Sequence, residues 1–127
     1  MSRDYKKLEV WKLAHKLVLK TYDMTKKFPK SEWFGLISQM RRAAVSIPAN
    51  IVEGAGRKGQ KEYIHFLYTS LSSCNELGYY IYLSAELNFI DNREYKEMET
   101  LSLQVSKMLQ GLIKRIEKDL DNSKANG

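Results

Sequence analysis

Few residues of this chain combine the type and spacing that catalysis or metal binding requires. Glu62 and His65 form a Glu-x-x-His pair, which would place two metal ligands on one face of a helix. A di-iron bundle needs a second such pair, and no second Glu-x-x-His occurs. Cys74 falls between Leu67 and Ile81 on one helical face, where a small buried apolar residue is the simpler interpretation. We therefore expect no metal, no cofactor and no catalytic residues, and predict that the protein is not an enzyme.

Three glycines match the dinucleotide-binding motif G-x-G-x-x-G, namely Gly54, Gly56 and Gly59. That motif requires a preceding strand and a βαβ unit, whereas a helical pattern precedes these glycines, so a dinucleotide site is not expected. Cations lie beside the start of the following helix, where unpaired amides and the helix dipole favour an anion. These cations are Arg57, Lys58 and Lys61, and a phosphate contact here is one prediction from the sequence.

A row of lysines follows one side of the first predicted helix, at Lys12, Lys16, Lys20 and Lys27. Neighbours four positions apart repel by about 0.2 to 0.5 kcal/mol per pair, so helix stability does not explain the row. One interpretation is a surface that binds a phosphate backbone. Its further members would be Arg42, Arg57, Lys58 and Lys61. The alternative interpretation is a solvated face that only keeps the protein soluble.

The composition favours one small helical domain. The chain has 127 residues, of which 43% are hydrophobic and 28% charged, a balance that suits a single core. Seven glycines and two prolines leave too few turn signals for a β-sandwich or barrel. One cysteine, no signal-peptide pattern and no long apolar run predict a cytoplasmic protein with no membrane partner. The net charge of +6 permits a polyanionic partner.

Apolar residues recur every three or four positions in four stretches, which predicts an all-α protein. The expected helices cover residues 8–27, about 31–54, 60–88 and 91–120, forming one domain over 1–120 with a polar, disordered tail at 121–127. Ser31 and Asp91 are expected to cap the second and fourth helices, and Pro48 to kink the second. Trp33 is placed in the inner stripe of the second helix. Short connections predict an up-down-up-down antiparallel four-helix bundle.

The third predicted helix carries more apolar surface than one bundle face needs. Besides its core stripe, a second stripe lies about a quarter turn away, at Ile64, Tyr68, Leu71, Tyr79 and Tyr82. Tyrosine supplies contact area together with a hydroxyl that can remain hydrated, as at protein interfaces. We predict that this stripe is a homo-oligomer interface; the alternative is that the rings only cover the edge of the bundle.

Several segments resemble one known family. They are LEVWKLAHKLV at 8–18, the pair Phe28-Pro29, FGLISQMRRAAVSIPANIVEGAGR at 34–57 and KEYIHFLYTSL at 61–71. Together they resemble bacterial four-helix-bundle proteins that include those encoded by 23S ribosomal RNA intervening sequences, over nearly the whole chain to about residue 120. The chain is also similar to the accessory proteins of diversity-generating retroelements, which are basic pentameric barrels that bind nucleic acid and a reverse transcriptase.

The resemblance implies a bundle that assembles into a homo-oligomeric ring, commonly a pentamer. In that context Arg41 is expected to be half-buried or at a subunit contact, whereas Arg42 points outward and meets phosphate. The leading hypothesis is a non-enzymatic oligomer whose basic surface binds the RNA or DNA backbone, with structured ribosomal RNA as one candidate target. The alternative is an oligomeric scaffold or adaptor that recruits a protein partner.

Overall fold

The computed structural model describes residues 3–126, and this part of the chain is all-helical with no strand. Four long helices are α1 (Glu9–Thr25), α2 (Ser38–Ala55), α3 (Gln60–Glu86) and α4 (Asn92–Asn126). A 3₁₀ turn, η1 (Tyr5–Lys7), precedes α1. Between α1 and α2 lie a second 3₁₀ turn, η2 (Lys30–Glu32), and a π-helical turn, η3 (Trp33–Ile37). The all-α class and the four predicted helices are confirmed.

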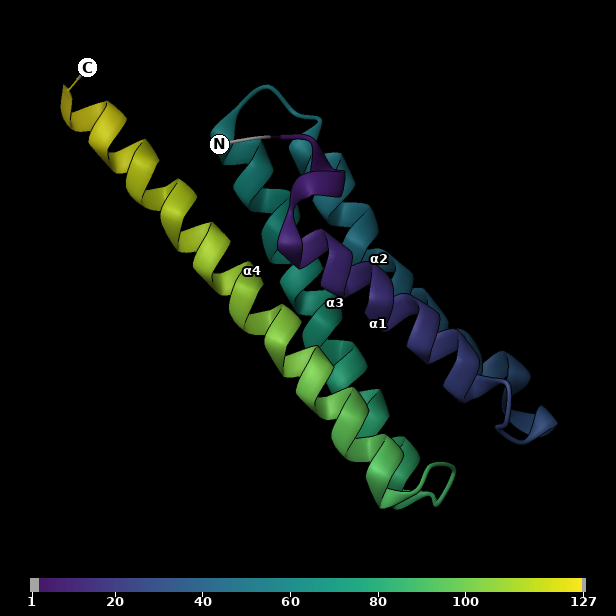
Figure 1. The fold of residues 1–127 in the computed structure, drawn as a ribbon. Coiled ribbons are helices and arrows are strands. Elements are labelled where there is room, and N and C mark those ends of the chain that lie inside the picture. The colour runs from purple at the N-terminus through teal and green to yellow at the C-terminus, as the bar shows by residue number, and fades with distance from the viewer. Residues whose placement is uncertain (1–2, 127) are drawn as a thin grey trace.

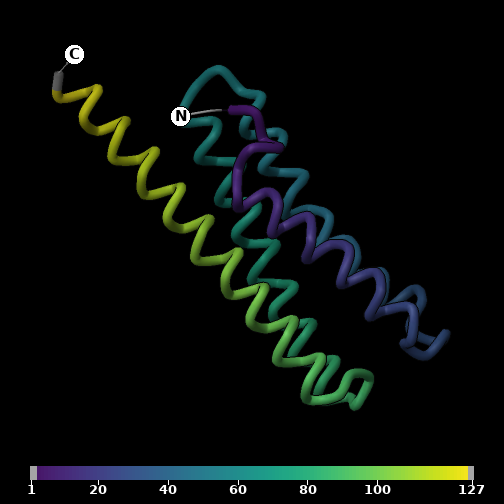
Figure 2. Tube along the Cα trace, in the orientation of Figure 1, coloured from purple at the N-terminus to yellow at the C-terminus, as the bar shows by residue number. Residues whose placement is uncertain are grey.

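The helices lie side by side along their lengths, and their connections fall at the two ends of the molecule (Figures 1 and 2). Ser84, late in α3, contacts Met40, early in α2, whereas Ser70, earlier in α3, contacts Ile47, later in α2. Residue numbers therefore rise along one helix as they fall along the other. Cys74 likewise contacts Ser102 of α4. The N-terminal segment returns to the α2–α3 connection, where Arg3 donates to the carbonyl of Arg57. α3 thus joins α2 to α4 across the bundle.

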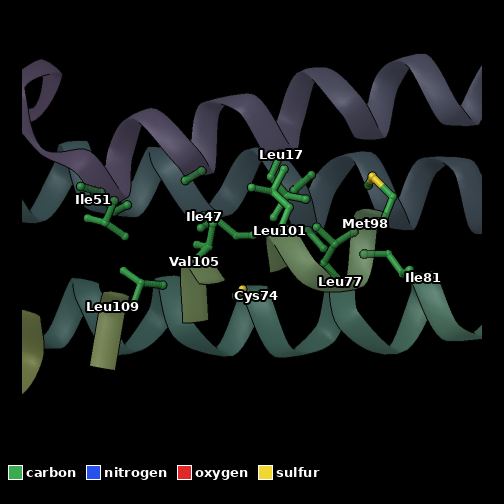
Figure 3. Packing of buried hydrophobic residues seen from close by; sticks show 14 of the residues in the cluster. Leu17, Ile47, Ile51, Cys74, Leu77, Ile81, Met98, Leu101, Val105 and Leu109 are labelled. Atoms are coloured by element: carbon green, nitrogen blue, oxygen red, sulfur yellow. The ribbon is translucent and has the colours of Figure 1, made fainter. Parts of the chain in front are cut away.

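The core is a continuous set of apolar side chains contributed by all four long helices (Figure 3). Leu17 of α1, Ile47 of α2, Leu77 of α3 and Leu109 of α4 are all fully buried. Each such side chain stabilises the fold by about 1.5 to 3 kcal/mol relative to an exposed one. The three-to-four-residue spacing in the sequence therefore identified the inner faces.

Among the residues that the structure describes, five buried serines and threonines interrupt this apolar core, namely Thr21, Thr25, Ser70, Ser84 and Ser102. Thr21 and Thr25 each donate to the backbone carbonyl four residues earlier in α1, at 2.8 and 2.7 Å. Ser84 does the same in α3, at 2.8 Å from the Tyr80 carbonyl. These bonds satisfy the hydroxyls locally, which is why a polar residue can occupy a core position.

The start of α2 differs from the prediction. Ser31 lies within η2 and does not cap the helix; instead the Glu32 carboxylate accepts from the Leu36 amide at 3.3 Å. Gly35 has non-helical dihedral angles of φ −106° and ψ −112°, so the backbone turns here before α2 begins. This turn carries Trp33 out of the inner stripe, and its side chain is 54% exposed. The prediction of Trp33 as a core residue is wrong.

Pro48 lies inside α2 and is buried, and the helix continues through it to Ala55. The proline does not end the helix, and a kink there stays a prediction. Polar side chains surround this turn: Asn50 donates to the Ser46 carbonyl at 2.8 Å, and Ser70 of α3 donates to the Ile47 carbonyl at 2.8 Å. These bonds give Asn50 a structural role beside the proline.

The cap of α4 is confirmed, because the Asp91 carboxylate accepts from the Glu94 amide at 2.8 Å. The predicted end of this helix at residue 120 is wrong. α4 continues to Asn126, so the segment expected to be a disordered tail is helical over 121–126, and residue 127 lies outside the described part. The side chains over 121–125 are all exposed. This stretch therefore carries no apolar periodicity from which the last turns could be predicted.

Candidate nucleic-acid interface

The lysine row of α1 borders a groove between α1 and α4. Lys16 and Lys20 line this groove, of about 420 Å³, together with Lys96 and Glu97 of α4. Within residues 3–126, neither Lys16 nor Lys20 takes part in an ion pair. Lys12 differs because its ammonium lies 3.2 Å from the Glu9 carboxylate. We call Lys16, Lys20 and Lys96 the α1–α4 lysine group; Lys96 was not among the predicted binding residues.

Lys27 lies two residues past the end of α1 and forms an ion pair with an acidic residue. Its ammonium is 3.1 Å from a carboxylate oxygen of Glu94, near the start of α4. The hydrogen bond to Glu94 raises the pKa of Lys27, so its charge is retained. Exposed pairs of this kind contribute little to stability.

A second group of cations lies where α2 meets α3. Arg57, Lys58 and Lys61 are all exposed there, as the sequence suggested from their place beside the first turn of α3. The α3 N-terminus has no side-chain cap. Arg57 is shared between two carboxylates, at 3.5 Å from Glu53 and 4.0 Å from Glu62. These pairs assign a structural partner to Glu53 and lower the net positive charge of the group.

Arg3 joins this second group, although no sequence pattern marked it. It donates to the Arg57 carbonyl and to the Gln60 side chain, and its guanidinium lies 4.8 Å from the centre of the Tyr63 ring. The approach of α3 to α2 here depends on Gly54, where an added Cβ would come within 2.9 Å of Tyr63. Of the three glycines in the G-x-G-x-x-G pattern, Gly54 lies inside α2 and Gly56 at its end, and Gly54 permits close packing of the two helices.

Arg42 lies apart from the α1 lysines. It lines a hollow of about 630 Å³ between the end of α1, η3 and the start of α2. We call this hollow, together with an adjoining one of about 600 Å³ that shares Trp33, Ile37 and Arg41, the aromatic-arginine pocket. Its aromatic members are Tyr22, Phe28, Trp33 and Phe34, and its cationic members are Lys26, Lys30, Arg41 and Arg42.

Arg41 is half-buried and held in place within this pocket. Its Nε donates to the Thr25 hydroxyl at 3.0 Å, and its guanidinium lies 4.5 Å from the Tyr22 ring centre and 5.3 Å from that of Trp33. A guanidinium nitrogen also donates to the Tyr22 carbonyl at 3.5 Å, so contacts with two rings and two hydrogen bonds fix the plane of the guanidinium. Phe34 beside it is 92% exposed. Sequence reasoning missed the pocket because Trp33 had been assigned to the core.

The predicted oligomer stripe on α3 divides into two parts. Ile64 and Leu71 are half-buried and pack against the core of their own chain. Tyr68, Tyr79 and Tyr82 are 47%, 58% and 51% exposed. The Tyr68 hydroxyl donates to Glu117 at 3.4 Å, and that of Tyr82 donates to Glu86 at 3.2 Å. The exposed tyrosines therefore have partly satisfied hydroxyls and available ring faces.

The cysteine and one of the histidines considered as chemical groups in the sequence pack against other residues of the fold. Cys74 is buried, with its Sγ 3.4 Å from the Ser102 carbonyl, and burial raises the pKa of the thiol, which opposes nucleophilic reactivity. His15 stacks on Trp11 with ring centres 5.2 Å apart. In the part of the chain that the structure describes, no group of three or more His, Cys, Asp or Glu could hold a metal ion. None of the helices described is long and apolar enough to span a bilayer.

The fold and its charged surface define a small, basic, all-helical bundle protein. Residues 6–111 match the family model of the 23S rRNA-intervening sequence protein, and the chain belongs to this family. The fold is similar to that of a protein of unknown function from the S23 ribosomal protein family of Bacteroides thetaiotaomicron. The two share 24% sequence identity with a TM-score of 0.77, over 83% of this chain and 95% of that chain. A comparison with curated proteins finds no match.

Proposed function

We propose that this protein is a non-enzymatic homo-oligomer that binds the phosphate backbone of RNA in the cytoplasm. The observation that carries this proposal is the α1–α4 lysine group, where Lys16 and Lys20 line a groove without ion-pair partners in the described part of the chain. The family description refers to a sequence within 23S ribosomal RNA, which makes structured ribosomal RNA the first target to test.

The electrostatics support backbone binding of low sequence specificity. Lys16 and Lys20 are one helical turn apart, so their charges repel along α1, and Lys96 adds a third cation across the groove. A phosphate bound among them relieves this repulsion and releases condensed counterions from the nucleic acid. Arg57, Lys58 and Lys61 form a second contact area at the α2–α3 connection.

The proposed assembly is a ring of up-down-up-down antiparallel bundles, each kinked at Pro48, in which several copies place their cations on one shared surface. Tyr68, Tyr79 and Tyr82 supply exposed aromatic area for subunit contacts. The pentamer implied by the sequence resemblance is the first stoichiometry to test. Native mass spectrometry at micromolar protein measures it, and a monomer under those conditions refutes the assembly.

The binding test is a titration of fluorescent structured ribosomal RNA, duplex DNA and single-stranded RNA at low and high salt. We expect log affinity to fall linearly with log salt, with a slope of about 0.9 per phosphate contacted on a duplex. Charge reversal by Lys16→Glu and Lys20→Glu should lower the affinity and the slope. Lys118→Glu with Lys124→Glu is the matched control, because it makes the same charge change at exposed positions near the end of α4. No affinity for any probe at low salt refutes the proposal.

The alternative is an oligomeric scaffold or adaptor that recruits a protein partner. The exposure of Tyr68, Tyr79 and Tyr82 favours it, since tyrosine-rich surfaces are typical of protein interfaces. A partner that co-purifies after nuclease treatment and high salt, and that is lost on Tyr79→Ser with Tyr82→Ser, supports this function. Retention of the same partner by the lysine variants separates it from nucleic-acid binding.

A further inference from the structure

We propose that the aromatic-arginine pocket binds an unpaired base of single-stranded RNA together with an adjacent phosphate. This inference rests on the proposed function and adds a strand-selective site to it. Among the residues that the structure describes, no aromatic side chain lines the groove of the α1–α4 lysine group, so this group supplies contacts to the backbone alone. The pocket at the α1–α2 end has both rings and cations.

The rings of the pocket keep solvent-exposed surface for stacking, most of it on Phe34, because the Arg41 guanidinium already lies over one part of Tyr22 and of Trp33. Phe34 is 92% exposed, Trp33 54% and Tyr22 38%, and all three line the same hollow. Exposed aromatic rings in a group are unfavourable in water, so the arrangement calls for an occupant with flat apolar faces. Bases have such faces, and each base stacked on an aromatic side chain contributes substantially to the affinity for a single strand.

The charge of the pocket selects an anionic occupant. Four cations line its two hollows, namely Lys26, Lys30, Arg41 and Arg42, and no carboxylate is among their lining residues in the described part of the chain. The nearest carboxylate in sequence, Glu32, is turned to the Leu36 amide. Asp23 lines a different hollow, toward α4. A phosphate next to the stacked base would therefore meet cations only.

Arg41 is prearranged for this role. Its guanidinium is held by Thr25 and by stacking on Tyr22 and Trp33, so little side-chain freedom is lost when a ligand binds. Each hollow, at about 630 and 600 Å³, falls within the range of small-molecule sites and can admit a nucleotide. The two adjoin at Trp33, which gives a strand a path with more than one contact.

A second copy of this chain is a less suitable occupant. Every copy has a net charge of +6, so it has no excess of carboxylates. A neighbouring copy bound here would therefore leave the four cations of the pocket without neutralising partners. Base-paired RNA is also excluded from stacking, because its bases are already stacked on one another. The combination of rings and unopposed cations therefore favours an unpaired strand.

The experiment compares binding of a single-stranded uridine oligonucleotide with binding of duplex RNA of the same length. The variants are Phe34→Leu and Trp33→Leu, and the control is Leu103→Ala, which shortens an exposed apolar side chain of α4 that belongs neither to the pocket lining nor to the proposed subunit contact. Because Phe34 has almost no buried surface, its substitution leaves the core intact. We expect each pocket variant to weaken single-strand binding about tenfold, to change duplex binding less than twofold, and to leave the control at wild-type affinity.

Fluorescence gives a second, direct measurement. The chain has two tryptophans, so Trp11→Phe leaves Trp33 as the only reporter. Stacking of a base should quench Trp33 on adding the single strand and leave it unchanged on adding the duplex. Equal weakening of both probes by the pocket variants, or binding of both probes unchanged, overturns the pocket while leaving backbone binding intact.

Two further outcomes are distinct. If Phe34→Leu dissociates the oligomer at unchanged single-strand affinity, the pocket is a contact between copies and the inference is wrong. If the wild-type protein binds neither probe at low salt, the proposed function itself fails and the pocket assignment fails with it.

Discussion

Substitution of Tyr63 by phenylalanine should stabilise the protein, which is the opposite of what most substitutions in a core do. The Tyr63 side chain is 1% exposed, and its buried hydroxyl has no hydrogen-bond partner within residues 3–126. An unsatisfied buried hydroxyl costs about 1 to 3 kcal/mol. Phenylalanine removes that oxygen and keeps the ring, including its contact with the Arg3 guanidinium. We expect a gain of about 1 kcal/mol in the free energy of unfolding, or about 4 °C in Tm.

The effect of pH on this variant follows from the same burial. Desolvation raises the pKa of Tyr63 above its ordinary value of 10.0, so the folded state keeps the proton that the unfolded state releases. The wild-type protein therefore loses stability as the pH rises above about 10, where the unfolded chain ionises. The phenylalanine variant has no such proton, so its advantage over the wild type should widen in that range.

Urea unfolding followed by circular dichroism at pH 7 and above pH 10 measures both effects. Tyr79→Phe is the matched control, because that ring is 58% exposed and the same change should be neutral. A loss of stability in Tyr63→Phe at pH 7 would refute the reasoning, since it would show that the hydroxyl makes a favourable bond in the folded protein.

Three further predictions concern the helices and the thiol. Gly54→Ala should destabilise the protein by about 1 kcal/mol, because the added Cβ would lie 2.9 Å from Tyr63. Gly111→Ala should stabilise it by about 1 kcal/mol, because an added Cβ there meets nothing within 4 Å. Thermal melts that give both changes the same sign would contradict this. Asp91→Ala should cost about 1 kcal/mol by removing the α4 cap, and unchanged urea unfolding would show that the bond to Glu94 contributes nothing. Cys74 should react with a thiol reagent only through unfolding, so its rate should rise with urea; rapid labelling of the native protein would contradict the burial of the thiol.

Hydrophobic periodicity was sufficient for the helices and most of the core. Leu17, Ile47, Leu77 and Leu109 occupy inner positions because burial of large apolar groups dominates the free energy of folding. The pattern failed at Trp33, where Gly35 changes the backbone direction by a local dihedral choice that periodicity does not encode. It also omitted buried threonines and serines, since the backbone carbonyls that accept from their hydroxyls are placed by the helices themselves.

The candidate site was harder to predict than the fold. Charge alone identified Lys16 and Lys20, but it could not show that Lys12 and Lys27 have acidic partners from elsewhere in the chain or helix. Arg42 was grouped with these lysines, although α2 places it among aromatic rings. Which cations share a surface is decided by tertiary packing, and that information is absent from any local spacing.

The last turns of α4 have a consequence for how the molecule loses its structure. Ile116 is fully buried, whereas every side chain over 121–125 is exposed, and in Figure 1 this end of the helix projects past its neighbours. A short helical stretch with no packed face is only marginally stable in water. Its amides should exchange with deuterium far sooner than those beside Val105, and trypsin should cut after Lys118 and Lys124 while the remainder stays folded. The same end would accept a fused tag or surface anchor with little effect on the bundle.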